Sequence, residues 1–362
     1  MPWGGAGVTD TDLRASERAF RKAAALDPKT PETQLALANF LWRAGRADEA
    51  EPVLKSVADE HPEERVANLA LGAYYSLVGR NDDAVPYLKK VAAKNVTEQA
   101  GAGGGAAGAT AGRATASAAL IELYLRTKRD EEALALLASD LPSDPTRIGL
   151  RLAEVEFRTG KRDQAVRRVD EMLAQTPKPP RATEVKAHFL LEMHQIDEAV
   201  TLARAAAAED SQSASARLLL GQVLLASGDR NGAADEYKAA ARLDPGEADA
   251  FLGMATASLA LGRRQDALLN AREAARLKPG DRAAAITVVK ALILSEDTSG
   301  AEQALAPLAS RTPASPDVLV LTGQLNAARG NKAAARAAFT KALQLAPDSA
   351  DATAGLASLD SK

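Results

Sequence analysis

Apolar residues along this chain recur in paired blocks, each with the spacing of one helical face. The segment 214–247 shows the pattern most fully. Its first stripe combines Arg217, Leu220, Gly221 and Leu224 at the i, i+3, i+4, i+7 positions of a helix. Arg217 stands where a bulky apolar residue is expected. Gly228 follows this stripe and suits the left-handed cap that ends a helix.

A second stripe in the same segment predicts a second helix. Ala233, Tyr237 and Ala240 form its apolar face, and Pro245 ends it because proline lacks the N–H that would continue the helix. Small residues at Gly221 and Ala233 let the two helices approach closely. A single hairpin of this size cannot bury its apolar face alone, so stacked copies are expected.

The hairpin pattern repeats with a period of 34 residues. Prolines with this spacing are Pro245, Pro279, Pro313 and Pro347, and also Pro28 and Pro62. The alanine column comprises Ala50, Ala84, Ala133, Ala165, Ala199, Ala233, Ala267, Ala301 and Ala335. Glycines in register are Gly45, Gly79, Gly160, Gly228, Gly262 and Gly330. We therefore expect about nine hairpins, starting at Pro31, Arg65, Ala114, Thr146, Pro180, Ala214, Ala248, Arg282 and Pro316.

The fourth and fifth units depart most from the pattern. Glu156 and Lys186 occupy positions where a core residue is expected, and Ser211 replaces the closing proline. These units either pack loosely or shift their register by a residue or two.

The segments outside the regular units have distinct compositions. The expected organisation is a flexible terminus at 1–8, a half-repeat helix at 9–29, units at 30–96, an insertion loop at 97–113, units at 114–349 and a capping helix at 350–362. The insertion is rich in glycine and alanine, which is typical of a flexible linker. It contains a GxGxxG match at Gly103, Gly105 and Gly108, but lacks the preceding apolar strand that a dinucleotide site requires.

The two ends carry unequal half-units. Residues 9–28 have the register of a second helix, and residues 350–362 have that of a first helix. The simpler interpretation is that each caps the array. The alternative is that the C-terminal half-unit of one molecule pairs with the N-terminal half-unit of the next. Such a head-to-tail contact would build a homo-oligomer or fibre, because a heterologous contact need not close.

On these residues the chain resembles the tetratricopeptide repeat (TPR) family. The family's pattern is matched most fully by Leu220, Gly221, Gly228, Ala233, Tyr237, Ala240 and Pro245, and again by Leu319, Gly323, Gly330, Ala335, Phe339, Ala342 and Pro347. The resemblance covers nearly the whole chain. It implies an all-α, right-handed superhelical solenoid of about nine helix-turn-helix repeats with half-units at both ends. The alanine- and arginine-rich units look like those of bacterial members, some of which serve envelope or exopolysaccharide assembly.

Composition narrows the function. The 362 residues are 46% apolar and 4% aromatic, so the core must use small and aliphatic side chains. The formal net charge of −3 does not favour a dedicated nucleic-acid binder. The absence of cysteine excludes disulfides, thiolate metal sites and cysteine nucleophiles. No membrane span or signal peptide is visible. The sequence leaves the compartment open: cytoplasmic as the chain stands, periplasmic or extracellular if a signal segment was removed.

Residues suited to catalysis are few. His188 and His194 lie six residues apart, which does not place them on one helical face as a metal pair would need, and His61 precedes Pro62 in a turn. Acidic pairs occur at helix starts, where negative charge stabilises the helix N-terminus. We therefore expect no enzyme activity, no catalytic residue, no metal and no cofactor.

The resemblance implies where a partner would bind, because the first helices of TPR proteins line a concave groove. The groove candidates are Leu35, Asn39, Trp42, Arg43, Glu122, Arg126, Glu154, Arg158, His188, Gln222, Lys290 and Gln324. Glu122 with Arg126, and Glu154 with Arg158, could equally be i,i+4 pairs that support an exposed helix. Trp42 is the best single candidate for a contact, since tryptophan is enriched at binding hot spots.

The expected partners are protein or peptide segments. The family's clamp for a terminal carboxylate uses Lys and Asn on successive first helices. Here only Asn39 fits, and Leu35 and Leu69 fall where a clamp would be polar. The later groove positions Leu252, Ile286 and Val320 are apolar, which suggests a hydrophobic or helical ligand or another copy of the chain. The sequence thus predicts a non-enzymatic scaffold. The alternative is a self-assembling structural fibre, with or without another polymer bound.

Overall fold

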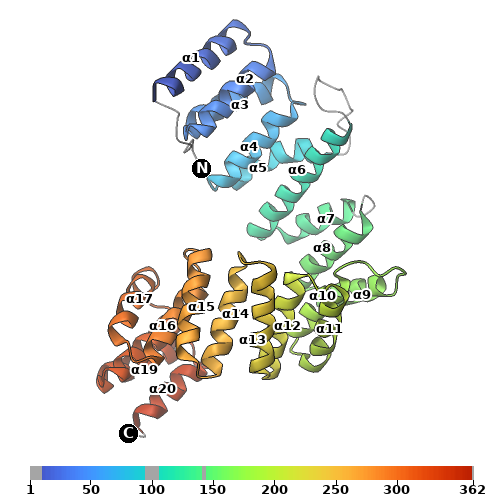
Figure 1. Ribbon diagram of the computed structural model, residues 1–362. Coiled ribbons are helices and arrows are strands. Elements are labelled where there is room, and N and C mark those ends of the chain that lie inside the picture. The colour runs from blue at the N-terminus through green and yellow to red at the C-terminus, as the bar shows by residue number, and fades with distance from the viewer. Residues whose placement is uncertain (1–9, 94–105, 141–143, 361–362) are drawn as a thin grey trace. The chain divides into compact units, whose positions relative to one another are not determined.

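A computed structural model describes residues 10–93, 106–140 and 144–360 of the chain. These residues form twenty α-helices, and no strand occurs among them (Figure 1). The chain divides into two compact parts, an N-terminal unit of residues 1–165 and a C-terminal unit of residues 166–362. The all-α repeat fold expected from the periodicity is confirmed.

Even-numbered helices after α1 take the place of the first helix in each repeat, and are called A helices below. They are α2 (Pro31–Arg43), α4 (Arg65–Leu77), α6 (Ala106–Arg126), α8 (Pro145–Arg158), α10 (Ala182–Glu192), α12 (Ala214–Ser227), α14 (Ala248–Ala260), α16 (Arg282–Leu294), α18 (Pro316–Ala328) and α20 (Ala350–Asp360). Nine of these ten begin within two residues of a start expected from the sequence.

The odd-numbered helices take the second place and are called B helices. They are α1 (Asp10–Leu26), α3 (Ala47–Glu60), α5 (Asn81–Ala92), α7 (Asp130–Asp140), α9 (Arg162–Leu173), α11 (Ile196–Glu209), α13 (Arg230–Leu243), α15 (Arg264–Leu277), α17 (Thr298–Arg311) and α19 (Lys332–Leu345). From α1 to α8 and from α10 to α20 each helix packs on the next one in the chain, and successive A helices of the C-terminal unit also touch each other. Neighbouring hairpins therefore cover each other's apolar sides in order.

The turn from each A helix to its B helix contains one residue in the left-handed region, with φ between 58° and 91°. These residues are Gly45, Gly79, Lys128, Gly160, His194, Gly228, Gly262, Glu296 and Gly330. A Cβ on the glycines among them would meet no atom within 4 Å. Glycine is favoured there because the backbone requires a positive φ, and crowding plays no part.

The alanine column marks the closest approach of the helices. Every alanine of the 34-residue column has an exposed fraction of 0%. In the C-terminal unit, glycines also make room for a ring. A Cβ on Gly221 or Gly253 would lie 2.8 Å or 2.5 Å from the ring of Tyr237, so Tyr237 fits between the A helix of its own hairpin and that of the next.

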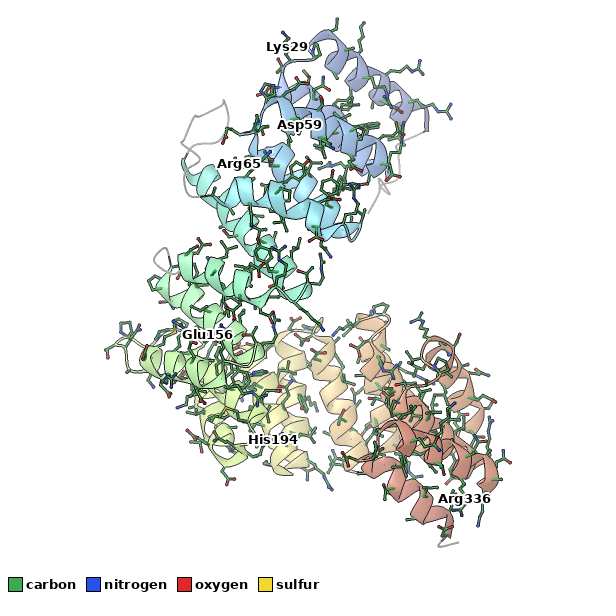
Figure 2. All side chains as sticks on the ribbon, turned by 180° about the vertical axis from the view of Figure 1, so that it is seen from behind. Lys29, Asp59, Arg65, Glu156, His194 and Arg336 are labelled. Atoms are coloured by element: carbon green, nitrogen blue, oxygen red, sulfur yellow. The ribbon has the colours of Figure 1, made fainter. Side chains whose placement is uncertain are left out.

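The same arrangement places α20. The ring of Phe339 lies between Gly323 and Gly355, and a Cβ on either glycine would come within 2.5 Å of that ring. Gly355 belongs to α20, which therefore occupies the position of an A helix against the last full hairpin. Arg336 of α19 pairs with Asp360 of α20 and fixes its far end (Arg336 is labelled in Figure 2).

The insertion differs from its expected extent of residues 97–113. Helix α6 begins at Ala106, so residues 106–113 are helical, and residues 97–105 lie outside the described part of the chain. The physical reason is the alanine content of 106–113, because alanine has the highest helix propensity and outweighs the two glycines there.

Two charged residues at core positions form ion pairs, one within its hairpin and one with the preceding hairpin. The Nη1 atom of Arg217 lies 2.9 Å from Oε2 of Glu236 on the following B helix. Lys186 Nζ lies 2.7 Å from Oδ1 of Asp170. Glu156 of α8 has an exposed fraction of only 2% (labelled in Figure 2). These substitutions for apolar residues are therefore accommodated inside regular hairpins.

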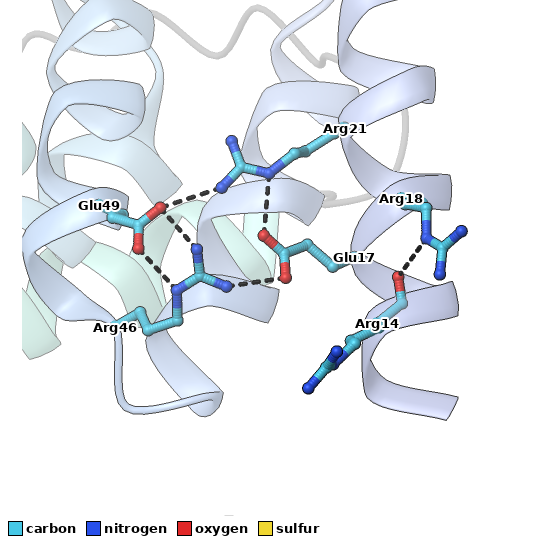
Figure 3. Close-up of polar contacts among 6 residues, drawn as sticks. All are labelled: Arg14, Glu17, Arg18, Arg21, Arg46 and Glu49. Carbon is cyan, nitrogen blue, oxygen red and sulfur yellow. Dashed lines mark hydrogen bonds and ion pairs between the residues drawn. The ribbon is translucent and has the colours of Figure 1, made fainter. Parts of the chain in front are cut away.

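The first helix is attached by both apolar and charged contacts. Phe20 of α1 packs on Phe40 of α2 with ring centroids 5.3 Å apart. Figure 3 shows a network in which Glu17 of α1 accepts from Arg21 at 3.0 Å and from Arg46 at 2.8 Å. Arg21 and Arg46 both donate also to Glu49 of α3. Hydrogen bonds from Arg46 and then Arg21 hold the pKa of Glu17 below its ordinary value.

Candidate binding surfaces

Helix α2 carries the expected candidates of the N-terminal unit. Asn39 and Arg43 are exposed, whereas Leu35 and Trp42 are half-buried and pack against the core. The indole of Trp42 meets the ring of Tyr74 edge-on, with centroids 5.6 Å apart. Trp42 is thus held in one orientation with part of its surface still accessible. The structure shows Leu35 packed on apolar neighbours, which fits the absence of a polar clamp at that position.

A polar network behind Trp42 was not anticipated from the sequence. The hydroxyl of Tyr75 donates to Glu51 at 2.8 Å, and that carboxylate also accepts from Arg80 at 3.0 Å. Burial opposes the charge of Glu51, but these two hydrogen bonds outweigh it and lower the pKa of Glu51. Arg80 also stacks over the ring of Tyr75, 4.5 Å from its centroid. The adjacent Tyr74 and Tyr75 were the feature of the sequence that could have indicated this network.

The candidates on α6 and α8 are exposed or half-buried, but they do not form the expected i,i+4 pairs. Glu122 pairs with Arg151 of α8, and Arg151 also reaches Glu154 at 3.3 Å. Arg126 donates to Oδ1 of Asn81 at 2.6 Å. Glu122 and Arg126 therefore meet partners on neighbouring hairpins, whereas Glu154 meets Arg151 of its own helix. These charges connect repeats, while Arg158 is exposed at the end of α8.

The A helices of the C-terminal unit carry three parallel rows of side chains, each with the 34-residue register. The central polar row consists of His188, Gln222, Thr256, Lys290 and Gln324. One flanking row consists of Leu218, Leu252, Ile286 and Val320, and the other of Leu225, Leu259 and Ile293. His188 and Thr256 are exposed, and Gln222, Lys290 and Gln324 are half-buried.

The flanking rows are less open than expected. Val320, predicted as an open groove position, has an exposed fraction of 4%, because it packs with Leu319 and Phe339 in the last core cluster. Leu252 and Ile286 are half-buried. The rows therefore offer narrow apolar strips on either side of a polar strip, with the successive A helices in contact beneath them.

A hollow of about 300 Å³ opens where α16, α18 and α20 meet. Its lining consists of Lys290, Pro316, Asp317, Val320, Ser349, Ala350 and Asp351. Lys290 Nζ lies 3.6 Å from Oδ2 of Asp351. Asp317 is held by Arg282, whose Nη2 lies 2.6 Å from Oδ1. Two expected groove positions, Lys290 and Val320, thus meet in one depression.

Histidines and carboxylates do not assemble into a reactive centre in the described residues. His188 is exposed on α10, and His194 occupies the left-handed turn position with φ 58° (Figure 2). His61 is half-buried, with Nε2 3.2 Å from the carbonyl oxygen of Lys29. Over the described ranges, no group of three or more His, Cys, Asp or Glu residues could hold a metal ion. Nor does any described helix have the length and apolarity to cross a membrane.

Two family profiles match the chain, and both describe a tetratricopeptide repeat. One matches residues 9–71. The other matches residues 150–214, 185–248, 218–282 and 290–350, which together cover more than half of the chain. A comparison with curated proteins gives no significant match.

Solved structures share the fold at low sequence identity. Human IFIT1, solved as a dimer with m7Gppp-AAAA, is 16% identical with a TM-score of 0.57, covering 98% of this chain and 86% of that one. PilW, a type IV pilus biogenesis factor, is 21% identical with a TM-score of 0.53, covering 59% and 99%. Pseudomonas aeruginosa pilF is 18% identical with a TM-score of 0.51, covering 60% and 98%. Identities this low establish similarity of fold alone.

Proposed function

The chain belongs to the tetratricopeptide repeat family, and from this premise we propose that it is a non-enzymatic scaffold whose A-helix face binds polypeptide segments. The fold is that of a protein-interaction scaffold. The observation that carries the proposal is the polar row of the C-terminal unit with an apolar row on each side.

An extended polypeptide matches this arrangement. Its backbone presents N–H and C=O groups that need partners, and its side chains alternate between two directions. The side chains of Gln222 and Gln324 can both donate and accept, and Lys290 can donate. Packed helices lie about 8–10 Å apart and an extended chain rises about 3.3 Å per residue, so each A helix serves roughly three residues. The apolar rows would receive side chains from either direction.

The test uses a defined probe. Fluorescein-labelled, N-acetylated nonapeptide pools are titrated with the full chain and followed by anisotropy. The double variant Gln222→Ala with Gln324→Ala should weaken binding of the best pool about tenfold, the loss of one to two hydrogen bonds. Asp235→Asn on the exposed side of α13 is the control and should leave binding unchanged. Absence of binding by every pool, or equal binding by both variants, contradicts the proposal.

Trp42 is proposed as a second contact, in the N-terminal unit. Its indole is fixed by Tyr74 and half-exposed, so stacking on it costs little side-chain entropy. Trp42→Phe retains an aromatic ring against Tyr74, and Trp42→Ala does not. For a peptide that contacts this site, Trp42→Ala should weaken binding more than Trp42→Phe. Unchanged affinity in both variants removes Trp42 from the binding surface.

A specific observation also favours the head-to-tail alternative as a second function. Ser16 and Ala23 of α1 are exposed, although residues in the same register, such as Ala50 and Ala240, are fully buried against their A helix. Ala357 of α20 is likewise exposed at the register of the buried Gly323. A second copy would supply the B helix that α20 can receive and the A helix that α1 can receive.

Cross-linking distinguishes this alternative, because the chain has no cysteine of its own. The variant Ser16→Cys with Ala357→Cys should form disulfide-linked ladders on oxidation if copies join end to end. A matched pair, Arg18→Cys with Ala357→Cys, places one thiol elsewhere on α1 and should not. A constant monomer mass over a wide concentration range in sedimentation velocity, without ladders, excludes the assembly.

A further inference from the structure

The hollow between α16, α18 and α20 has an apolar floor and a charged rim. Pro316, Val320 and Ala350 contribute the apolar surface, and Lys290, Asp317 and Asp351 contribute the charges. Its volume of about 300 Å³ is at the small end of the range for binding pockets and is enough for one large side chain. It adjoins the polar row through Lys290, so a segment lying along that row would pass over it.

The carboxylate of Asp317 is already occupied. Its Oδ1 atom accepts from Nη2 of Arg282 at 2.6 Å, from the backbone N–H of Val318 at 3.0 Å, and from the hydroxyl of Ser315. This carboxylate ties α16 to the start of α18. The guanidinium of Arg282 balances its charge, and Oδ1 offers no free acceptor site.

Lys290 and Asp351 are placed differently. Their charged atoms are 3.6 Å apart, beyond hydrogen-bond distance, and their side chains are 39% and 62% exposed. An ammonium with three donors and a carboxylate acceptor therefore stand side by side at the mouth of an apolar depression. This pairing is complementary to the C=O and N–H of a single residue in an extended backbone.

We propose that this hollow is a selectivity subsite that takes one uncharged aliphatic side chain of a bound extended segment. The inference rests on the proposed peptide-binding function and names the residue class that the C-terminal end of the groove selects. The backbone C=O of that residue accepts from Nζ of Lys290, and its N–H donates to Asp351. Its side chain packs on Pro316, Val320 and Ala350. The exposed carboxylate of Asp351 disfavours an acidic side chain at this position.

The experiment uses three nonapeptide pools that differ at one central position, fixed as Leu, Lys or Glu. Anisotropy titrations with the full chain should give the tightest binding for the Leu pool and the weakest for the Glu pool, by about tenfold, the size of a modest like-charge penalty. Lys290→Met should weaken binding of the Leu pool about tenfold, because a charged hydrogen bond is lost. Asp351→Asn should reduce the difference in affinity between the Glu and Leu pools, because it removes a repelling charge.

Matched variants separate this subsite from general charge effects. Lys341→Met on α19 and Asp235→Asn on α13 change the same charges at exposed positions outside the hollow and should leave the pool order intact. Circular dichroism confirms that each variant is folded. Equal binding of the three pools, or variants at 290 and 351 that behave as their controls, overturns the subsite while peptide binding itself stands. If no pool binds the unaltered chain, both proposals fall.

Discussion

The two units build the same hairpin from different side chains. In the N-terminal unit, Trp42, Tyr74, Tyr75 and Tyr87 form a chain of rings with successive centroids 5.4–5.7 Å apart, and tyrosine hydroxyls end on carboxylates of α3. In the C-terminal unit, single rings such as Tyr237 sit between glycines of two A helices. Packing of the rings in the N-terminal unit therefore depends on hydrogen bonds at the ends of large side chains. In the C-terminal unit it depends on glycines that have no Cβ.

The largest expected effect comes from filling the space that a glycine leaves for an aromatic ring in the C-terminal unit. Gly253→Ala places a Cβ about 2.5 Å from the rigid ring of Tyr237, and it should destabilise the C-terminal unit by about 2–3 kcal/mol. Gly72→Ala in the N-terminal unit meets Leu88 at 2.4 Å, but this flexible side chain can move, so we expect a loss of at most about 1 kcal/mol. Urea denaturation followed by circular dichroism measures both. Equal losses would mean that ring rigidity does not set the cost.

The next largest effect comes from removing a tyrosine hydroxyl in the N-terminal unit. Tyr75→Phe removes the hydrogen bond to Glu51 and leaves that carboxylate with Arg80, so a loss of about 1–2 kcal/mol is expected. Tyr237→Phe is the matched control in the other unit, where burial alone accounts for the raised pKa of the hydroxyl. It should cost less than Tyr75→Phe in the same denaturation experiment. The reverse order would contradict the contrast between the units.

A smaller effect concerns the turns. His194→Gly and Glu296→Gly should each stabilise the C-terminal unit by about 1 kcal/mol, because L-residues pay this cost in the left-handed region and glycine does not. Gly228→Ala in the equivalent turn should cost a similar amount. Midpoints of thermal unfolding show the direction. A loss of stability on introducing glycine would indicate that the side chain at the turn makes a compensating contact.

The smallest effect is a pH dependence of the attachment of α1 in the N-terminal unit. The pKa values of Glu17 and Glu49 lie below their ordinary value of 4.5, chiefly because Arg46 donates to both. Carboxylates with a lowered folded-state pKa stabilise the fold above the unfolded value and lose that contribution as pH falls through the folded one. Hydrogen exchange of α1, corrected for the intrinsic rate, should therefore quicken below about pH 4.5. Glu17→Gln should flatten this dependence.

The sequence predicts the repeat because its signals are local and recur. The prolines, the turn glycines and the alanine column each encode a backbone requirement, and all A helices but α6 begin within two residues of the start that these columns predict. The contacts of Arg126 and Glu122 could not be predicted in this way. Their partners, Asn81 and Arg151, lie on neighbouring hairpins, at distances set by how the hairpins stack.

The same limit applies to the candidate surface. Register places Lys290 and Val320 on one face, but the depression they share also needs Ala350 and Asp351 of α20. Periodicity identified residues 350–362 as helical and was silent on which side of α18 they would lie. The burial of Val320 was missed for a related reason, since a face of a helix is open only until its neighbour is placed.

The aromatic ring held between two glycines has a consequence for how such chains change length. Tyr237 needs Gly221 from its own hairpin and Gly253 from the one that follows, and Phe339 uses Gly323 and Gly355 in the same manner. A hairpin that carries the second glycine can therefore follow any hairpin that carries both the ring and the first glycine. Whole hairpins could therefore be duplicated or lost at these two positions without new contacts having to evolve between neighbours. The tyrosine–carboxylate pairs of the N-terminal unit are specific to their hairpins, so those hairpins are harder to exchange.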